Sequence, residues 1–243
     1  MRQLSPPQPL DLSGWGLIVV DMQNDFLTRE GYYARRARYE RQVRAERLTV
    51  QTMIERLTPA AATPPAKLGL RSRSLESVVR NVCTVIEQAR AGRLPIAHLK
   101  AVYHHRFKVK ASFFLTSQDR RHYPCKPGTW GQEFINPIQE LISVKNTRSR
   151  EKVIVKHTFN GFHETALRDF LQRQRVHTVL VAGVETQVCV MATALAASFH
   201  QLKPIILTDC TATAQKYRGQ YALNLFRDGF GTTCRSTEVF CSK

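Results

Sequence analysis

The chain has 243 residues, of which 43% are hydrophobic, so it is long enough and apolar enough to bury the core of one α/β domain. No apolar run approaches the roughly 18 residues of a membrane-spanning helix, and we expect no membrane span. The formal net charge is +17. Because no nucleic-acid-binding motif accompanies this charge, we interpret it as a solvated basic surface and expect no nucleic-acid partner.

The first ten residues, MRQLSPPQPL, contain no apolar stretch of the kind found in a secretory signal, so we expect a cytoplasmic location. The six cysteines form no CxxC pair and match no zinc or disulfide framework. We therefore interpret them as free thiols. They are Cys83, Cys125, Cys189, Cys210, Cys234 and Cys241.

The N-terminal third begins with a strand and then changes character. Gly16 to Asp21 (GLIVVD) is a short β-branched run that ends in a carboxylate, which is typical of a buried parallel strand. The next segment, MQNDFLTREG, leaves this strand as a loop. Residues 33–74 are dense in Arg and Glu and include a Pro/Ala-rich stretch. We predict a basic helical or flexible insertion there.

Regular alternation of helix and strand resumes after the insertion. A helix is predicted from Leu75 to Ala91 and a strand from Pro95 to Leu99, followed by a basic, irregular segment from Tyr103 to Pro127. A short helix or turn from Phe134 to Ile142 precedes a strand from Lys152 to Lys156. The remaining predicted elements are, in order, a helix over 165–174, a strand over 176–184, a helix over 188–199, a strand over 204–209, a helix over 217–230 and an edge strand within 234–240.

Strands separated by helices predict a single α/β domain over residues 1–243, with a central, mainly parallel sheet of about six strands. Right-handed crossovers place the carboxyl ends of such strands at one edge, where ligand sites lie. Asp21 ends the first strand, Lys156 ends the third, and Cys189 follows the fourth. We therefore expect these three side chains to converge.

A thiol, an ammonium group and a carboxylate at one edge suit nucleophilic catalysis. A free cysteine has a pKa of about 8.5. The start of a helix and a nearby Lys156 predict a lowered pKa for Cys189. Asp21 can accept the thiol proton and pass it to a leaving amine. The thiolate would attack a carbonyl and form a thioester-type intermediate that water hydrolyses.

Three segments carry a resemblance to a known family. IVVDMQNDF (18–26), VKHTFNGFHETALRDFL (155–171) and VAGVETQVCVMATALAA (181–197) resemble the signature segments of the isochorismatase-like cysteine hydrolases, in order and spacing as well as in residues. That superfamily includes nicotinamidases, N-carbamoylsarcosine amidases, biuret hydrolases and ureidoacrylate amidohydrolases. The resemblance implies a Rossmann-like three-layer α/β/α sandwich and a catalytic triad of Asp21, Lys156 and Cys189.

The resemblance also implies a cis peptide bond between Val184 and Glu185 and an oxyanion hole formed by the backbone N–H groups of Glu185 and Cys189. Family members commonly form dimers or tetramers, so a homo-oligomer is expected. Residues near the motifs commonly border the substrate in this family. The candidates for substrate binding here are Asn24, Phe26, Trp130, Phe159 and Phe162, each of which has an alternative role in packing or capping.

The chain departs from the nicotinamidases in their metal-binding segment, where those enzymes resemble one another in an Asp-x-His motif with a further His. The corresponding stretch here, HLKAVYHHRFKVKASFF (98–114), contains the adjacent histidines His104 and His105 and no carboxylate. Adjacent histidines suit a single ion poorly. We therefore predict no metal and no other cofactor, and nicotinamide becomes a less favoured substrate.

The predicted function is cysteine-dependent hydrolysis of a C–N bond in a small amide, ureide or carbamoyl compound. Two alternatives stay open. One is hydrolysis of a vinyl ether, as in true isochorismatases, which needs the aspartate but no thiol. The other is a basic protein that binds nucleic acid or another anion on a retired hydrolase scaffold. The presence of Cys189 and the complete set of triad residues favour the first function.

Overall fold

The computed structural model describes residues 10–35, 37, 73–103, 123–143, 150–214 and 216–240. Most of the insertion predicted at 33–74 lies outside these described residues, as do His104, His105 and Cys241. Six strands form one sheet in the order β3-β2-β1-β4-β5-β6, and every neighbouring pair is parallel. The predicted α/β fold with a parallel central sheet is therefore confirmed.

The elements follow the predicted alternation. The strands are β1 (Trp15–Val20), β2 (Ile96–Ala101), β3 (Glu151–Lys156), β4 (Thr178–Val184), β5 (Lys203–Ala212) and β6 (Thr232–Cys234). The helices are α1 (Asn24–Leu27), α4 (Arg73–Ala91), α5 (Asn136–Ser143), α6 (Leu167–Arg173), α7 (Met191–Phe199), α8 (Lys216–Gly229) and α9 (Ser236–Val239). The described residues also include the 3-10 turn η1 (Trp130–Gln132) and the π-helical turn η2 (Thr186–Val190).

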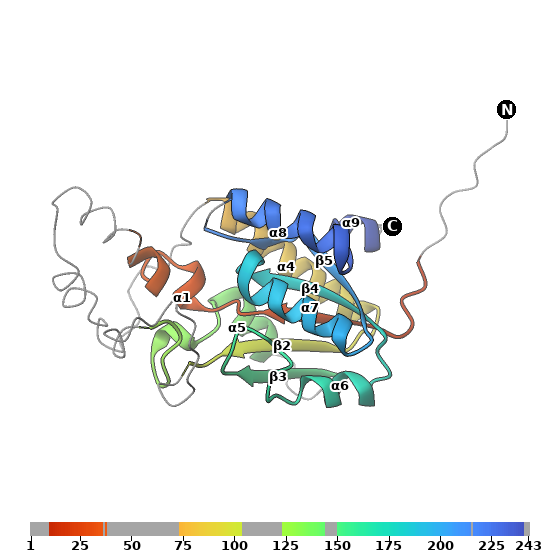
Figure 1. The fold of residues 1–243 in the computed structure, drawn as a ribbon. Helices are drawn as coiled ribbons and strands as arrows, with labels where there is room; N and C mark the ends of the chain where they lie inside the picture. Colours follow the sequence, from red (N-terminus) through yellow and green to blue (C-terminus); the bar gives the residue numbers. More distant parts are fainter. Residues whose placement is uncertain are drawn as a thin grey trace.

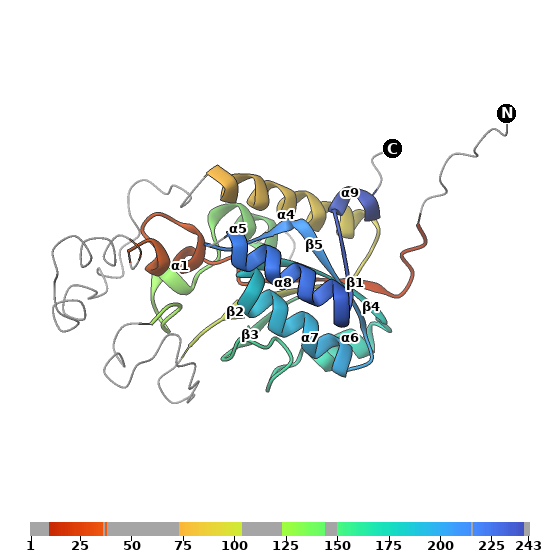
Figure 2. The same ribbon diagram turned by 45° about the horizontal axis from the view of Figure 1, so that its top comes forward.

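Helices cover both faces of the sheet, which gives the three layers of an α/β/α sandwich (Figures 1 and 2). The side chains of β1 alternate between the two interfaces. Leu17 and Val19 belong to the core cluster that includes α4, α5 and α9, and Ile18 and Val20 belong to the cluster that includes α6, α7 and α8. All four are fully buried, because a central parallel strand packs against a helical layer on each face.

Several elements differ from the sequence predictions. The predicted edge strand at 234–240 is wrong for most of its length, since β6 ends at Cys234 and Ser236–Val239 is helical. Asp209 favours a helix here, because its carboxylate accepts hydrogen bonds from the Ser236 backbone N–H and hydroxyl at 2.8 and 2.7 Å. The predicted loop after β1 contains α1, β5 continues to Ala212, and β2 continues to Ala101.

At the start of β3, Glu151 forms a network with Arg90 of α4 and His98 of β2. Arg90 donates to both carboxylate oxygens at 2.6 and 2.9 Å, and His98 Nε2 lies 2.8 Å from Oε1. Burial opposes ionisation of Glu151, but the contacts with His98 and Arg90 outweigh it and lower the pKa of Glu151 from 4.5 to about 2. The network thus joins the sheet to α4.

No helix of the described residues is long and apolar enough to cross a bilayer.

The Glu151 network predicts a loss of stability in acid. A carboxylate whose pKa is lowered by folding adds stability that is complete above its unfolded pKa and is lost as the pH falls toward the folded value. The free energy of unfolding should therefore decrease from about pH 5 to pH 2. Glu151→Gln should cost about 2–3 kcal/mol at neutral pH and flatten this decrease, measured by urea unfolding across the pH range. The exposed Glu140→Gln should behave like the parent; a Glu151→Gln curve parallel to that of the parent would contradict the assignment.

Candidate active site

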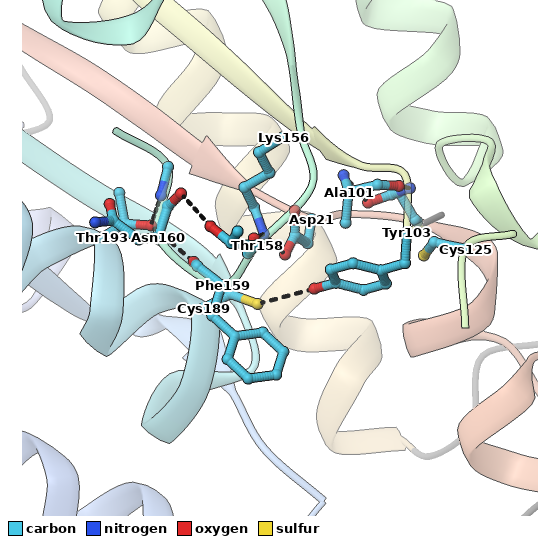
Figure 3. A network of polar contacts seen from close by, with 12 residues as sticks. Asp21, Ala101, Tyr103, Cys125, Lys156, Thr158, Phe159, Asn160, Cys189 and Thr193 are labelled. Carbon is cyan, nitrogen blue, oxygen red and sulfur yellow. Dashed lines mark hydrogen bonds and ion pairs between the residues drawn. The ribbon is translucent and has the colours of Figure 1, made fainter. Parts of the chain in front are cut away.

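Four neighbouring strands each deliver one reactive or polar side chain to the same edge of the sheet. Lys156 is the last residue of β3, Tyr103 lies two residues after β2, Asp21 follows β1 and Cys189 lies in η2 after β4. The register pairs Ala101 with Lys156 and places the strand ends side by side. Figure 3 shows the four side chains turned toward one another. The convergence expected from the strand ends is thus present in the structure.

A buried ion pair forms the floor of the site. Lys156 Nζ lies 2.7 Å from Asp21 Oδ2, and both side chains are 0% exposed. The ammonium group also donates to the backbone oxygen of Thr158 at 3.0 Å. Asp21 adopts a φ of 51°, a left-handed conformation that is uncommon for residues other than glycine. The backbone turns sharply at Asp21 and leaves its carboxylate beside the lysine.

Cys189 sits beside this ion pair in the π-helical turn that precedes α7. Its side chain is buried, at 4% exposure. The carbonyl oxygen of Glu185 accepts the backbone N–H groups of Val188 and Val190 at 3.0 and 3.3 Å, which fixes the turn around the cysteine. The Val184–Glu185 peptide bond is cis, at the predicted position. The backbone N–H groups of Glu185 and Cys189 belong to this turn, and their role as an oxyanion hole stays a prediction.

The predicted lowering of the Cys189 pKa is wrong. Burial is the largest influence and raises the pKa of Cys189 from 9.0 to about 12, although Lys156 and the hydroxyl of Tyr103 act in the opposite direction. Asp21 adds to the increase through its negative charge and its hydrogen bond with the thiol. The sequence predicted a lowered pKa from the nearby cation and the helix start, but removal of the thiol from water raises the pKa by more than these groups lower it. The resting side chain is therefore a thiol.

Burial acts in the same direction on Asp21. Desolvation raises the pKa of Asp21 above 3.8, and the opposing effects of Lys156, the Cys189 thiol and the Ala101 backbone N–H are smaller. For Lys156, the attraction of Asp21 and Cys189 outweighs desolvation, so its pKa is raised and its ammonium form is retained. A carboxylate with a raised pKa is a stronger base than an ordinary aspartate. The arrangement therefore supplies a base that can accept the thiol proton.

The aromatic residues predicted to bind substrate occupy different places. Phe159 is partly buried and packs edge-to-face with Tyr103, with ring centroids 6.2 Å apart. Phe26 is buried in the core against Tyr33, at 5.4 Å. Trp130 is partly exposed at the start of η1. Phe162 packs on His200, just beyond the C-terminal end of α7, whereas Cys189 precedes its N-terminal end. The structure thus places Phe159 beside Tyr103, and the substrate-binding roles of these aromatic residues stay predictions.

Three polar side chains after β1 join the loops around the site. Gln23 accepts the Ala101 N–H and donates to the backbone oxygens of Ala101 and Gln132. Asn24 donates to the Trp130 oxygen at 3.0 Å, so one of its amide hydrogens is used within the protein. Asp25 accepts the N–H groups of Cys125 and Tyr32 at 2.7 and 2.8 Å. Together they hold the segment 123–134 against the end of β2.

Tyr103 and Asp25 are the site residues that the sequence analysis missed. The predicted β2 ended at Leu99, two residues too early, and this error left Tyr103 in an irregular segment away from the sheet edge. Asp25 gave a signal in the sequence, since it follows Asp21 within the same motif. Its carboxylate is enclosed so closely that a Cβ at Gly131 would lie 2.1 Å from Oδ2. Glycine is required at that position because any larger side chain would displace Asp25.

Within the described ranges, no group of three or more His, Cys, Asp or Glu side chains is arranged to hold a metal ion. His104 and His105, the histidines considered above, lie outside those ranges. The prediction that no metal binds therefore rests on the sequence alone, which has no carboxylate in the stretch 98–114.

The comparison with protein families agrees with the geometry. The family model described as "Isochorismatase domain" matches residues 16–238, which is most of the chain and includes all four site residues. The chain belongs to the isochorismatase family. Its parallel sheet and flanking helices are those of an isochorismatase-like α/β fold.

Named relatives of this isochorismatase-family chain act on amides. It is 27% identical over 95 residues to a nicotinamidase of Saccharomyces cerevisiae, covering 36% of this chain and 44% of the relative. It is 29% identical over 91 residues to a maleamate amidohydrolase of Pseudomonas putida, covering 37% and 42%. The matches thus span less than half of either relative. The crystal structure of a pyrazinamidase/nicotinamidase from Streptococcus mutans superposes with a TM-score of 0.67 at 16% identity, covering 90% of this chain and 99% of the other, which shows the common fold.

Asp25 provides a test of how the loops are held. Asp25→Asn should replace one acceptor oxygen with an amide group facing backbone N–H donors, and should cost about 1–3 kcal/mol in the free energy of unfolding. The matched control is Asp11→Asn, an exposed aspartate that accepts from Ser13, and we expect little change there. Urea unfolding measures both. Equal stability of the two variants would contradict a structural role for Asp25.

Proposed function

We propose that this protein is a cysteine-dependent hydrolase that cleaves the C–N bond of a small amide, ureide or carbamoyl compound. The observation that carries the proposal is the buried ion pair of Asp21 and Lys156 beside the thiol of Cys189. Family membership and the amide chemistry named for the relatives support it. A nucleophile that is only 4% exposed suits a small substrate better than a polymer.

In the first half of the reaction, Asp21 accepts the proton of Cys189 as the sulfur attacks the substrate carbonyl carbon. Proton transfer has to accompany the attack, because the pKa of the thiol is about 12 and little free thiolate exists at neutral pH. The ammonium of Lys156 stabilises both the negative sulfur and the carboxylate. The carbonyl oxygen becomes an oxyanion, which we assign to the backbone N–H groups of Glu185 and Cys189.

In the second half, the oxyanion collapses and the C–N bond breaks. The leaving nitrogen takes the proton from Asp21 and departs as ammonia or an amine, and a thioester or thiocarbamate remains on Cys189. Asp21 then accepts a proton from water as its oxygen attacks the same carbon. The C–S bond breaks, the sulfur recovers a proton from Asp21, and the acid product leaves. Each proton that Asp21 accepts is thus passed on, first to the leaving nitrogen and then to the sulfur.

The two alternative functions receive less support from this geometry. Vinyl ether hydrolysis needs the carboxylate but gives no role to a thiol beside it. Binding of an anion on a retired scaffold gives no role to the buried ion pair. The substrate itself and the predicted homo-oligomer stay predictions. A small-molecule amide or carbamoyl compound is the proposed partner.

Loss of the sulfur tests the proposed nucleophile. Cys189→Ala should reduce ammonia release by at least about a thousandfold, because the proposed covalent intermediate forms on its sulfur. The substrates to assay are biuret, ureidoacrylate, N-carbamoylsarcosine, maleamate and nicotinamide. Cys83→Ala, which removes a partly buried thiol on α4, should retain parental activity.

Full activity of Cys189→Ala would rule out the nucleophile. Silence of the parent protein on all of these substrates, together with nucleic-acid binding that weakens steeply with salt, would instead favour the anion-binding alternative.

The raised pKa of Asp21 predicts the acid limb of the pH profile. Asp21 must be ionised to accept the thiol proton, so kcat/KM should fall as acidification protonates it. Because burial raises the pKa of Asp21 above 3.8, this fall should begin at a higher pH than an ordinary aspartate would give. Steady-state rates on an active substrate at a series of pH values measure the midpoint. A midpoint at or below 3.8 would contradict the raised pKa of Asp21.

A further inference from the structure

Tyr103 places a phenol hydroxyl against the proposed nucleophile. Its hydroxyl oxygen lies 3.7 Å from Cys189 Sγ, within hydrogen-bonding distance for sulfur (Figure 3). The side chain is 9% exposed, and its ring packs edge-to-face with Phe159. Lys156 Nζ lies 5.9 Å from the ring centroid, at the distance of a cation–π contact. The backbone N–H of Tyr103 donates to the Cys125 oxygen at 3.1 Å, so both ends of the residue are held.

The direction of this hydrogen bond follows from the groups around the sulfur. Among the described residues, the charged or titratable side chains that act on Cys189 include Asp21 after β1, Lys156 at the end of β3 and Tyr103 after β2. Tyr33 and Cys125 also interact with it. Burial raises the pKa of Tyr103 well above 10, so the phenol stays protonated. In the proposed reaction the thiol proton passes to Asp21, whose charge acts on Cys189. The phenol O–H is therefore available to donate to the sulfur.

We propose that Tyr103 is a catalytic residue whose hydroxyl donates a hydrogen bond to the sulfur of Cys189 and stabilises the negative charge that develops there. The proposal rests on the proposed function, in which Cys189 is the nucleophile. Burial disfavours the thiolate, and a donor fixed against the sulfur offsets part of this penalty without adding a second net charge beside Lys156.

The hydrogen bond acts at two points in the reaction. During attack it stabilises the sulfur as its proton passes to Asp21. The sulfur is neutral in the thioester, so the bond weakens there. It strengthens again when the C–S bond breaks and the sulfur leaves with the electron pair. Tyr103 neither gains nor loses a proton, because its own pKa keeps the phenol intact throughout. It therefore assists both halves of the reaction as a fixed donor.

The test is the reactivity of Cys189 itself, which requires no knowledge of the substrate. Iodoacetamide alkylates the parent and Tyr103→Phe across a range of pH, and mass spectrometry follows the peptide that contains Cys189. Loss of the hydroxyl should slow alkylation of Cys189 about tenfold at each pH at which the protein is folded. On an active substrate, kcat should fall by a similar factor with little change in KM, since the bond is strongest in the transition state.

Two controls separate this role from a structural one. Tyr221→Phe removes the hydroxyl of a tyrosine that is 71% exposed on α8, and should match the parent in alkylation and rate. Thermal unfolding of Tyr103→Phe should match the parent, because the ring and its contact with Phe159 remain. If Tyr103→Phe is less stable, comparison at a temperature where both proteins are folded still isolates the change in the alkylation rate of Cys189.

The outcomes distinguish this inference from the proposed function. An unchanged alkylation profile and unchanged kcat in Tyr103→Phe, with Cys189→Ala inactive, would overturn the role of Tyr103 and leave the nucleophile in place. A shifted alkylation profile would support the hydrogen bond even before a substrate is known. Full activity of Cys189→Ala would instead remove the proposed function on which the inference depends.

Discussion

The ion pair between Asp21 and Lys156 is the interaction on which the rest of the site depends. Both side chains are completely buried, and their charged atoms lie 2.7 Å apart. A buried charge without its partner is strongly unfavourable, so each of these residues stays charged because the other is present. The fold holds them together from β1 and β3, and the intervening strand β2 supplies Tyr103. Cys189, from the turn after β4, completes the group.

Burial raises the pKa of both Cys189 and Asp21, and the two increases have opposite consequences for reactivity. It raises the pKa of the Cys189 thiol to about 12, which by itself would make the sulfur a poor nucleophile. It also raises the pKa of Asp21, which makes that carboxylate a better acceptor for the thiol proton. The ammonium of Lys156 and the hydroxyl of Tyr103 lower the pKa of Cys189 in part. In the proposed reaction, little thiolate is present before the substrate binds. The proton of Cys189 therefore moves to Asp21 as the sulfur attacks.

The sequence predicted the sheet and the convergence of Asp21, Lys156 and Cys189 because both follow from strong local patterns. Short β-branched runs such as LIVV identify buried strands, and a polar residue just after each run falls on the carboxyl edge of a parallel sheet. Two kinds of feature could not be predicted this way. The role of Tyr103 depends on where β2 ends, which pairing with β3 decides. The pKa of Cys189 depends on how completely the packed elements exclude water, which no spacing of residues reveals.

A double-mutant cycle on the ion pair tests the central claim most directly. Asp21→Asn, Lys156→Met and the double variant are compared with the parent in urea unfolding. If the two charges depend on each other, the double variant should be more stable than the sum of the single effects predicts, by at least about 1 kcal/mol, because neither single variant can satisfy the charge that remains. Additive effects would show that Asp21 and Lys156 are energetically independent, and would contradict the account of the site given above.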